Sequence, residues 1–186
     1  MIGRANQLLN QGKTSEALAL YREAAQLTPA DEDVHYNLGI ALARLGQTNE
    51  AMAEYEAALK IFPDYVEVHN NLGNLLVRAG KADEAITHFR AAIKSMPDHA
   101  PTYNNLGNAL RFKGDVLEAS RQFAKALALD TNYWEARFNL ANTYRAQERY
   151  ADAASEYREV LRLKPDFVPA RQALELAEQN LAPRPP

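Results

Sequence analysis

Apolar and small residues recur along the chain at helical spacing, in segments that end at glycine or proline. Between residues 33 and 63, they lie three or four positions apart up to Gly46, and again up to Pro63. Glycine readily adopts the left-handed conformation that ends a helix, and proline lacks the N–H group that a helix interior needs. The pattern therefore predicts a pair of antiparallel helices joined by a turn of two or three residues.

The same pattern returns every 34 residues. Leucine, a small residue and an aromatic residue keep this interval, in the columns Leu38, Leu72, Leu106 and Leu140; Gly39, Gly73, Gly107 and Ala141; and Tyr21, Tyr55, Phe89, Phe123 and Tyr157. Proline closes four of the units, at Pro29, Pro63, Pro97 and Pro165, and Thr131 closes the other. A fixed period of this size indicates stacked copies of one unit, because a single helix pair cannot bury its apolar faces alone.

This period divides the chain into five predicted repeats and a terminal helix, about eleven helices in all. The predicted repeats cover 1–31, 32–65, 66–99, 100–133 and 134–167, followed by a capping helix over 168–181 and a tail over 182–186. The first helix of the first repeat should be short. Four of the turns within the repeats contain Gly12, Gly46, Gly80 and Gly114, whereas the fifth has Glu148, where we expect some backbone strain.

The order Leu-Gly, Ala, Tyr or Phe, Ala and Pro over 34 residues resembles the tetratricopeptide repeat, and the resemblance covers about residues 1–167. It implies an all-α fold, a right-handed superhelical solenoid of antiparallel helix pairs whose first helices line a concave groove. Within a repeat, we expect Gly39 to lie at a close approach of the two helices, opposite Ala51. We expect Tyr55 to fill the wider gap toward the next repeat.

Asparagines on the predicted first helices form the candidate binding site. The adjacent column, which directly precedes the periodic leucines, contains Asn37, Asn71, Asn105 and Asn139. The downstream column, three residues further along each helix, contains Asn6, Asn74, Asn108 and Asn142, and Ile40 interrupts it. Asn70 and Asn104 add to this stripe. Residues three apart share a helix face, so both columns should point into the groove.

An asparagine amide offers two donors and an acceptor, which match the C=O and N–H groups of an extended peptide. Neighbouring first helices should stand about 10 Å apart, a distance that an extended peptide spans in about three residues. The arrangement is similar to the asparagine ladder in the tetratricopeptide region of O-linked N-acetylglucosamine transferase. The alternative is that the amides only solvate the groove or form hydrogen bonds between repeats.

Arginines further along the same helices complete the candidate site: Arg44, Arg78, Arg111 and Arg145. They could bind carboxylates of a ligand, or they could interact favourably with the negative end of each helix.

Composition excludes several other classes of function. The net charge of −3 does not favour nucleic-acid binding, and the absence of cysteine removes thiol chemistry. His35 and His69 share one repeat position that Tyr103 fills in the next repeat, so packing explains them better than metal binding. We therefore expect no catalytic residue, no metal and no cofactor.

The sequence thus predicts a monomeric interaction module that binds a protein or peptide segment in extended conformation. We expect no nucleic-acid partner and no membrane partner, and a cytoplasmic location because no signal or membrane-spanning segment is recognisable. Two alternatives stay open. The chain could be the substrate-recognition part of a larger glycosyltransferase, or it could be a scaffold that self-associates through the short first helix or the convex face.

Overall fold

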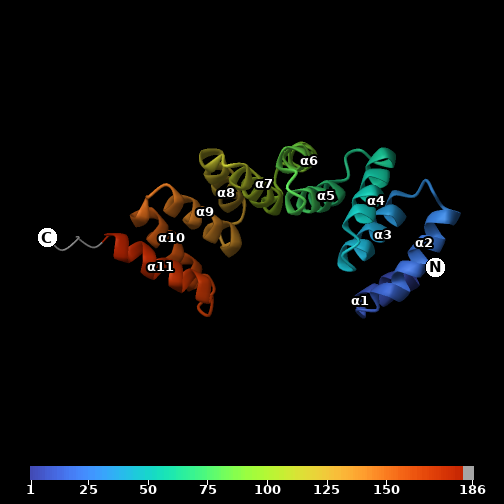
Figure 1. Ribbon diagram of the computed structural model, residues 1–186, viewed down its shortest axis with the longest axis horizontal. Helices are drawn as coiled ribbons and strands as arrows, with labels where there is room; N and C mark the ends of the chain where they lie inside the picture. Colours follow the sequence, from blue (N-terminus) through green and yellow to red (C-terminus); the bar gives the residue numbers. More distant parts are fainter. Residues whose placement is uncertain (182–186) are drawn as a thin grey trace. The chain divides into compact units, whose positions relative to one another are not determined.

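The structure, a computed structural model, describes residues 1–181, and these form eleven α-helices and no strand (Figure 1). The predicted all-α fold of antiparallel helix pairs is therefore confirmed. The helices are α1 Ile2–Asn10, α2 Thr14–Leu27, α3 Glu32–Arg44, α4 Thr48–Ile61, α5 Val66–Arg78, α6 Ala82–Ser95, α7 Ala100–Lys113, α8 Val116–Leu129, α9 Trp134–Ala146, α10 Tyr150–Leu163 and α11 Val168–Leu181. The predicted tail, 182–186, lies outside the described residues.

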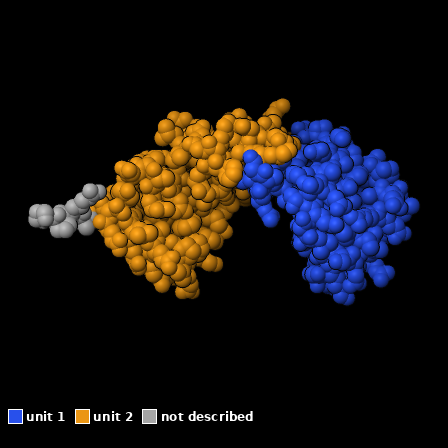
Figure 2. Space-filling model, in the orientation of Figure 1, with its two compact units in different colours: residues 1–80 blue, residues 81–186 orange. Residues whose placement is uncertain are grey.

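The chain comprises two compact units, Met1–Gly80 and Lys81–Pro186 (Figure 2). In the first unit, α1 packs on α2 and α3 packs on α4, and α2–α3 and α4–α5 contacts join consecutive pairs. In the second unit, each helix from α6 to α11 packs on the next one along the chain. First helices also touch one another within each unit, since α1 contacts α3, and α9 contacts both α7 and α11.

The turns within the helix pairs follow the sequence prediction closely. The four glycines, Gly12, Gly46, Gly80 and Gly114, have φ of +77°, +76°, +79° and +91°. At the same place in the fifth turn, Glu148 has a φ of 60° and is the one residue other than glycine with positive φ in the described part of the chain. A side chain in this region costs conformational energy, so the expected strain at Glu148 is confirmed.

Gly39 and Gly107 on the first helices lie directly against aromatic rings of the second helices. A Cβ added to Gly39 would lie 2.5 Å from Cε1 of Tyr55, and one added to Gly107 would lie 2.6 Å from Cε1 of Phe123. The predicted close approach at Gly39 is therefore confirmed, and the nearest side chain there is Tyr55. Tyr55 packs against Gly39 of its own helix pair and also forms a hydrogen bond with Asn71 of the next repeat.

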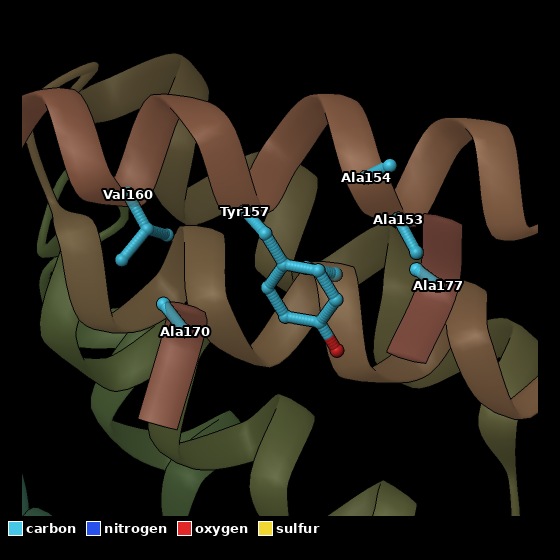
Figure 3. Packing of buried hydrophobic residues seen from close by; sticks show 7 residues of the cluster. Ala153, Ala154, Tyr157, Val160, Ala170 and Ala177 are labelled. Atoms are coloured by element: carbon cyan, nitrogen blue, oxygen red, sulfur yellow. The ribbon is translucent and has the colours of Figure 1, made fainter. Parts of the chain in front are cut away.

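The core of the C-terminal helices shows the same arrangement (Figure 3). Tyr157 is fully buried on α10, and Val160 and Ala153 lie beside Ala170 and Ala177 of α11. Leu181, the last residue of α11, is 48% exposed. Small residues on the buried face of α11 allow it to pack closely on α10.

Candidate functional site

The adjacent asparagine column forms hydrogen bonds between neighbouring first helices in the second unit. Asn139 on α9 donates from Nδ2 to Oδ1 of Asn104 on α7 at 2.9 Å. Tyr133 also interacts with Asn104, and this hydrogen bond partly offsets the burial that raises the pKa of the Tyr133 phenol. Asn104 is only 6% exposed, so the bond satisfies a polar group that would be costly to bury alone.

The same spacing of 35 residues recurs in the first unit, between Tyr36 and Asn71. Burial raises the pKa of the Tyr36 and Tyr55 phenols, and a hydrogen bond with Asn71 opposes that rise in both. Asn37 instead donates to the backbone carbonyl of Asp33 in its own helix at 2.7 Å. These amides of the adjacent column therefore have partners inside the fold, as the alternative structural interpretation expected.

Asn70 and Asn104 do not line the surface as predicted. They are 7% and 6% exposed, and Asn70 donates to the Val66 carbonyl in the preceding turn at 3.0 Å. Their place directly before the adjacent column turns them toward the neighbouring helix. Asn105, the remaining member of the adjacent column, is half-buried on α7.

The downstream column is more accessible. Asn6 and Asn74 are exposed, and Asn108 and Asn142 are half-buried. Two of these amides accept a hydrogen bond from a buried tyrosine on the second helix of their own pair. Tyr21 donates to Asn6 Oδ1 at 2.5 Å, and Tyr157 donates to Asn142 Oδ1 at 2.7 Å. Their NH₂ groups are not used in these two bonds.

A cavity of about 250 Å³ opens between α1 and α3 in the first unit. Its wall is formed by Asn6, Asn37, Ile40 and Arg44, and Tyr21 contributes from α2. Members of both asparagine columns therefore border one depression, which is large enough for a side chain. In the second unit, Asn108 and Asn142 lie on α7 and α9, two helices in direct contact.

Three of the four candidate arginines, Arg78, Arg111 and Arg145, are exposed and lie in the last turns of α5, α7 and α9. This position is favourable for a cation near the negative end of a helix. Arg145 also interacts with Tyr157: burial raises the pKa of this phenol, and the guanidinium acts in the opposite direction. Arg44 donates to the Leu9 carbonyl of α1 at 3.1 Å, so it links two first helices.

A third column of residues also recurs every 34 positions, and only its first three members, His35, His69 and Tyr103, were recognised from the sequence. A side chain near the start of α3, α5, α7, α9 and α11 donates to the backbone carbonyl six residues earlier, at the close of the preceding repeat. The donors are His35, His69, Tyr103, Arg137 and Arg171, at 3.1, 2.9, 2.9, 3.0 and 2.9 Å. The spacing of 34 residues between these donors is visible in the sequence. Their common role is not, because the residue type changes along the column from histidine to tyrosine and arginine.

His35 has a second partner, because its Nδ1 lies 2.6 Å from Oε2 of Glu54 on α4. Burial lowers the pKa of His35, but the bonds to Glu54 and to the Pro29 carbonyl outweigh it, and the pKa is raised. Both ring nitrogens face acceptors, so the imidazolium form, which donates from both, fits this place best. Residues 1–181 contain no group of three or more histidine and acidic side chains that could hold a metal ion.

None of the helices in residues 1–181 combines the length and the apolar character that crossing a membrane requires.

Family models described as TPR repeat match residues 5–46 and 42–80, and models described as tetratricopeptide repeat match residues 64–132 and 98–166. No curated protein gives a significant match to the chain.

Several solved structures have a similar fold. The TPR protein YrrB, described as having an unusual peptide-binding site, is 24% identical with a TM-score of 0.79 over 94% of this chain and 90% of its own. MamA from Desulfovibrio magneticus RS-1 is 23% identical with a TM-score of 0.82, over 89% of this chain and 94% of its own. The thermophilic TPR protein TTC0263 from Thermus thermophilus is 23% identical with a TM-score of 0.73, over 96% of this chain and 97% of its own. At sequence identities of 23% and 24%, these similarities show a shared fold and nothing further.

Proposed function

Because the chain belongs to the tetratricopeptide repeat family, whose members are generally protein-interaction modules, we propose that it binds an extended peptide segment across its first helices. The contacts would be made mainly by side-chain amides to the peptide backbone. The proposed role is non-catalytic, and the matching family models describe repeats only.

The observation that carries this proposal is the downstream column. Asn108 and Asn142 occupy the same register on two first helices that touch, and both keep part of their surface accessible. Asparagine is less favourable than alanine in a helix interior, by several tenths of a kcal/mol. Two such residues at one repeated, accessible position fit a surface selected for hydrogen bonding. The peptide-binding site described for YrrB, a protein of similar fold, is consistent with such a surface.

The adjacent column has a different part in this proposal. The contacts of Asn71 and Asn139 within the fold make these residues supports of the groove. Arg78, Arg111 and Arg145 lie exposed at the ends of the same helices, where they would meet acidic side chains of a bound segment.

The test uses the whole chain and an array of random-sequence dodecapeptides. The tightest binder, labelled with fluorescein, becomes the probe for fluorescence anisotropy. We expect N108A and N142A each to weaken binding by at least the equivalent of one neutral hydrogen bond, which is about 2- to 12-fold. We expect the control N49A, at an exposed asparagine on the second helix α4, to leave the affinity unchanged.

Methylation of the probe's backbone nitrogens separates backbone recognition from side-chain recognition, because it removes N–H donors and keeps every side chain. Weaker binding of the methylated probe supports the amide contacts. An array on which the wild-type protein binds no peptide overturns the proposed function.

We expect the protein to bind its segment as a monomer, with light scattering at several concentrations as the check. A mass that rises with concentration would favour the scaffold alternative. In that case Leu27, which is 68% exposed beside Met1 and Ile2 at an apolar cavity of about 280 Å³, is the first residue to replace.

A further inference from the structure

The aromatic residue that follows each downstream-column position by fifteen residues differs between repeats. Asn6 and Asn142 are followed at this distance by tyrosine, Tyr21 and Tyr157. Asn74 and Asn108 are followed by phenylalanine, at Phe89 and Phe123. In the second repeat the pair is Ile40 and Tyr55.

The hydroxyl group of these tyrosines reaches the asparagine of the same helix pair. Tyr157 is fully buried and donates to Asn142 Oδ1, and Tyr21, equally buried, donates to Asn6 Oδ1. Where isoleucine replaces the asparagine, Tyr55 interacts with Asn71 of the next first helix instead. In each of these three repeats, the tyrosine hydroxyl therefore forms a hydrogen bond with an asparagine amide of the groove.

Phe123 occupies the same place without a hydroxyl group. Its ring is fully buried against Gly107, the residue directly before Asn108, as the ring of Tyr55 lies against Gly39. The ring therefore fills the same space between the helices, but it cannot donate a hydrogen bond to Asn108.

This difference changes what each asparagine can offer to a peptide. A tyrosine that donates to Oδ1 occupies one of the two lone pairs of the oxygen and fixes the orientation of the amide, so the NH₂ group can donate to a peptide C=O in one direction only. An asparagine opposite phenylalanine can accept from a peptide N–H and donate to a peptide C=O together. A peptide backbone presents both groups, so the second kind of asparagine can turn its amide to fit the peptide with both lone pairs of Oδ1 available.

We propose that the second-helix aromatic residue decides how each downstream asparagine binds the peptide backbone. Phe123 leaves Asn108 able to turn its amide to pair with both a peptide N–H and a peptide C=O, whereas Tyr157 holds the amide of Asn142 in one orientation and occupies one lone pair of its Oδ1. This inference rests on the proposed function, and it makes Phe123 and Tyr157 positioning residues that act through the asparagines. Asn108 is then the principal backbone contact of the second unit.

Two reciprocal substitutions test this inference with the same fluorescein-labelled probe. F123Y supplies a hydroxyl that reaches Asn108 as Tyr157 reaches Asn142, and we expect binding to weaken about 2- to 12-fold. Y157F releases Asn142, and we expect binding to tighten by a similar factor. Y103F is the matched control, because Tyr103 donates to the Pro97 carbonyl and not to a groove asparagine; its affinity should not change.

The side-chain amide signals in ¹⁵N–¹H spectra report the hydrogen bond itself. In F123Y the Asn108 signal should move and exchange more slowly, and in Y157F the Asn142 signal should change in the opposite sense. A purely structural role of the rings would alter thermal stability without this reciprocal change in affinity.

Failure of the proposed function and failure of this inference would give different binding results. If the wild-type protein binds no peptide, the proposed function falls and this inference falls with it. If N108A weakens binding but F123Y, with its amide signal shifted, binds as tightly as the wild type, only this inference is overturned. Should F123Y fail to fold, unchanged affinity of Y157F overturns it equally.

Discussion

The ring of Phe123 lies so close to Gly107 that a Cβ on the glycine would stand 2.6 Å from Cε1 and 2.8 Å from Cδ1 of the ring. Phe123 is fully buried, so its ring has little room to withdraw. We expect G107L to lower the free energy of unfolding by about 1–3 kcal/mol or more through overpacking. Urea unfolding measures the change.

The control for this prediction is A128L, at an exposed position of α8, where the same added bulk points to solvent. Its stability should stay within about 0.5 kcal/mol of the wild type. A G107L variant as stable as A128L would show that this contact does not limit the packing of α7 on α8.

Glu148 has the left-handed conformation that glycine adopts in the four other turns. We expect E148G to raise the free energy of unfolding by about 0.5–1 kcal/mol, because relief of left-handed strain exceeds the added entropy of glycine in the unfolded chain. Thermal and urea unfolding measure it. E148A, which removes the charge but keeps the Cβ, should give no such gain; equal gains in both variants would point to charge instead of backbone strain.

The raised pKa of His35 predicts that its contribution to the stability of the fold decreases as the pH rises. Its pKa is raised in the folded state, so protonation stabilises the fold fully below the unfolded-state pKa of about 6.5. This contribution is lost as the pH rises through the folded-state pKa. As the pH rises from about 6.5 through the folded-state pKa, we therefore expect the urea midpoint of the wild type to fall relative to that of H35Y.

Tyrosine is a suitable replacement because Tyr103 makes the corresponding bond to the Pro97 carbonyl, and the ordinary pKa of a tyrosine side chain is about 10. E54Q removes the carboxylate beside His35 and should reduce the pH-dependent difference. Parallel pH profiles for the wild type and H35Y would contradict the raised pKa.

The two asparagine columns should respond in opposite ways to alanine. N139A removes the donor to the buried Oδ1 of Asn104, and we expect it to lower the free energy of unfolding by about 1–3 kcal/mol. N108A should preserve or slightly raise stability, since alanine is the better helix former. Urea unfolding of the two variants compares them directly, and equal losses would place Asn108 among the structural asparagines.

The sequence by itself determined the helices, their order and their turns. Glycine, proline and apolar spacing act within a few residues, so the α11 bounds, the glycine turns and the strain at Glu148 followed from local chemistry and the 34-residue period. Periodicity also assigned which residues share a column, because residues at equal intervals occupy equivalent places in equivalent units.

Only the tertiary structure decided what each member of a column contacts. Asn104 and Asn108 are four residues apart on one helix, yet the first accepts a bond from Asn139, while the second directly follows Gly107, which lies against the ring of Phe123. His35 and Arg171 differ in type but make the same bond to a carbonyl six residues earlier. Hydrogen-bond partners depend on side-chain length and on the neighbouring helix, and neither is visible in the period of a single chain.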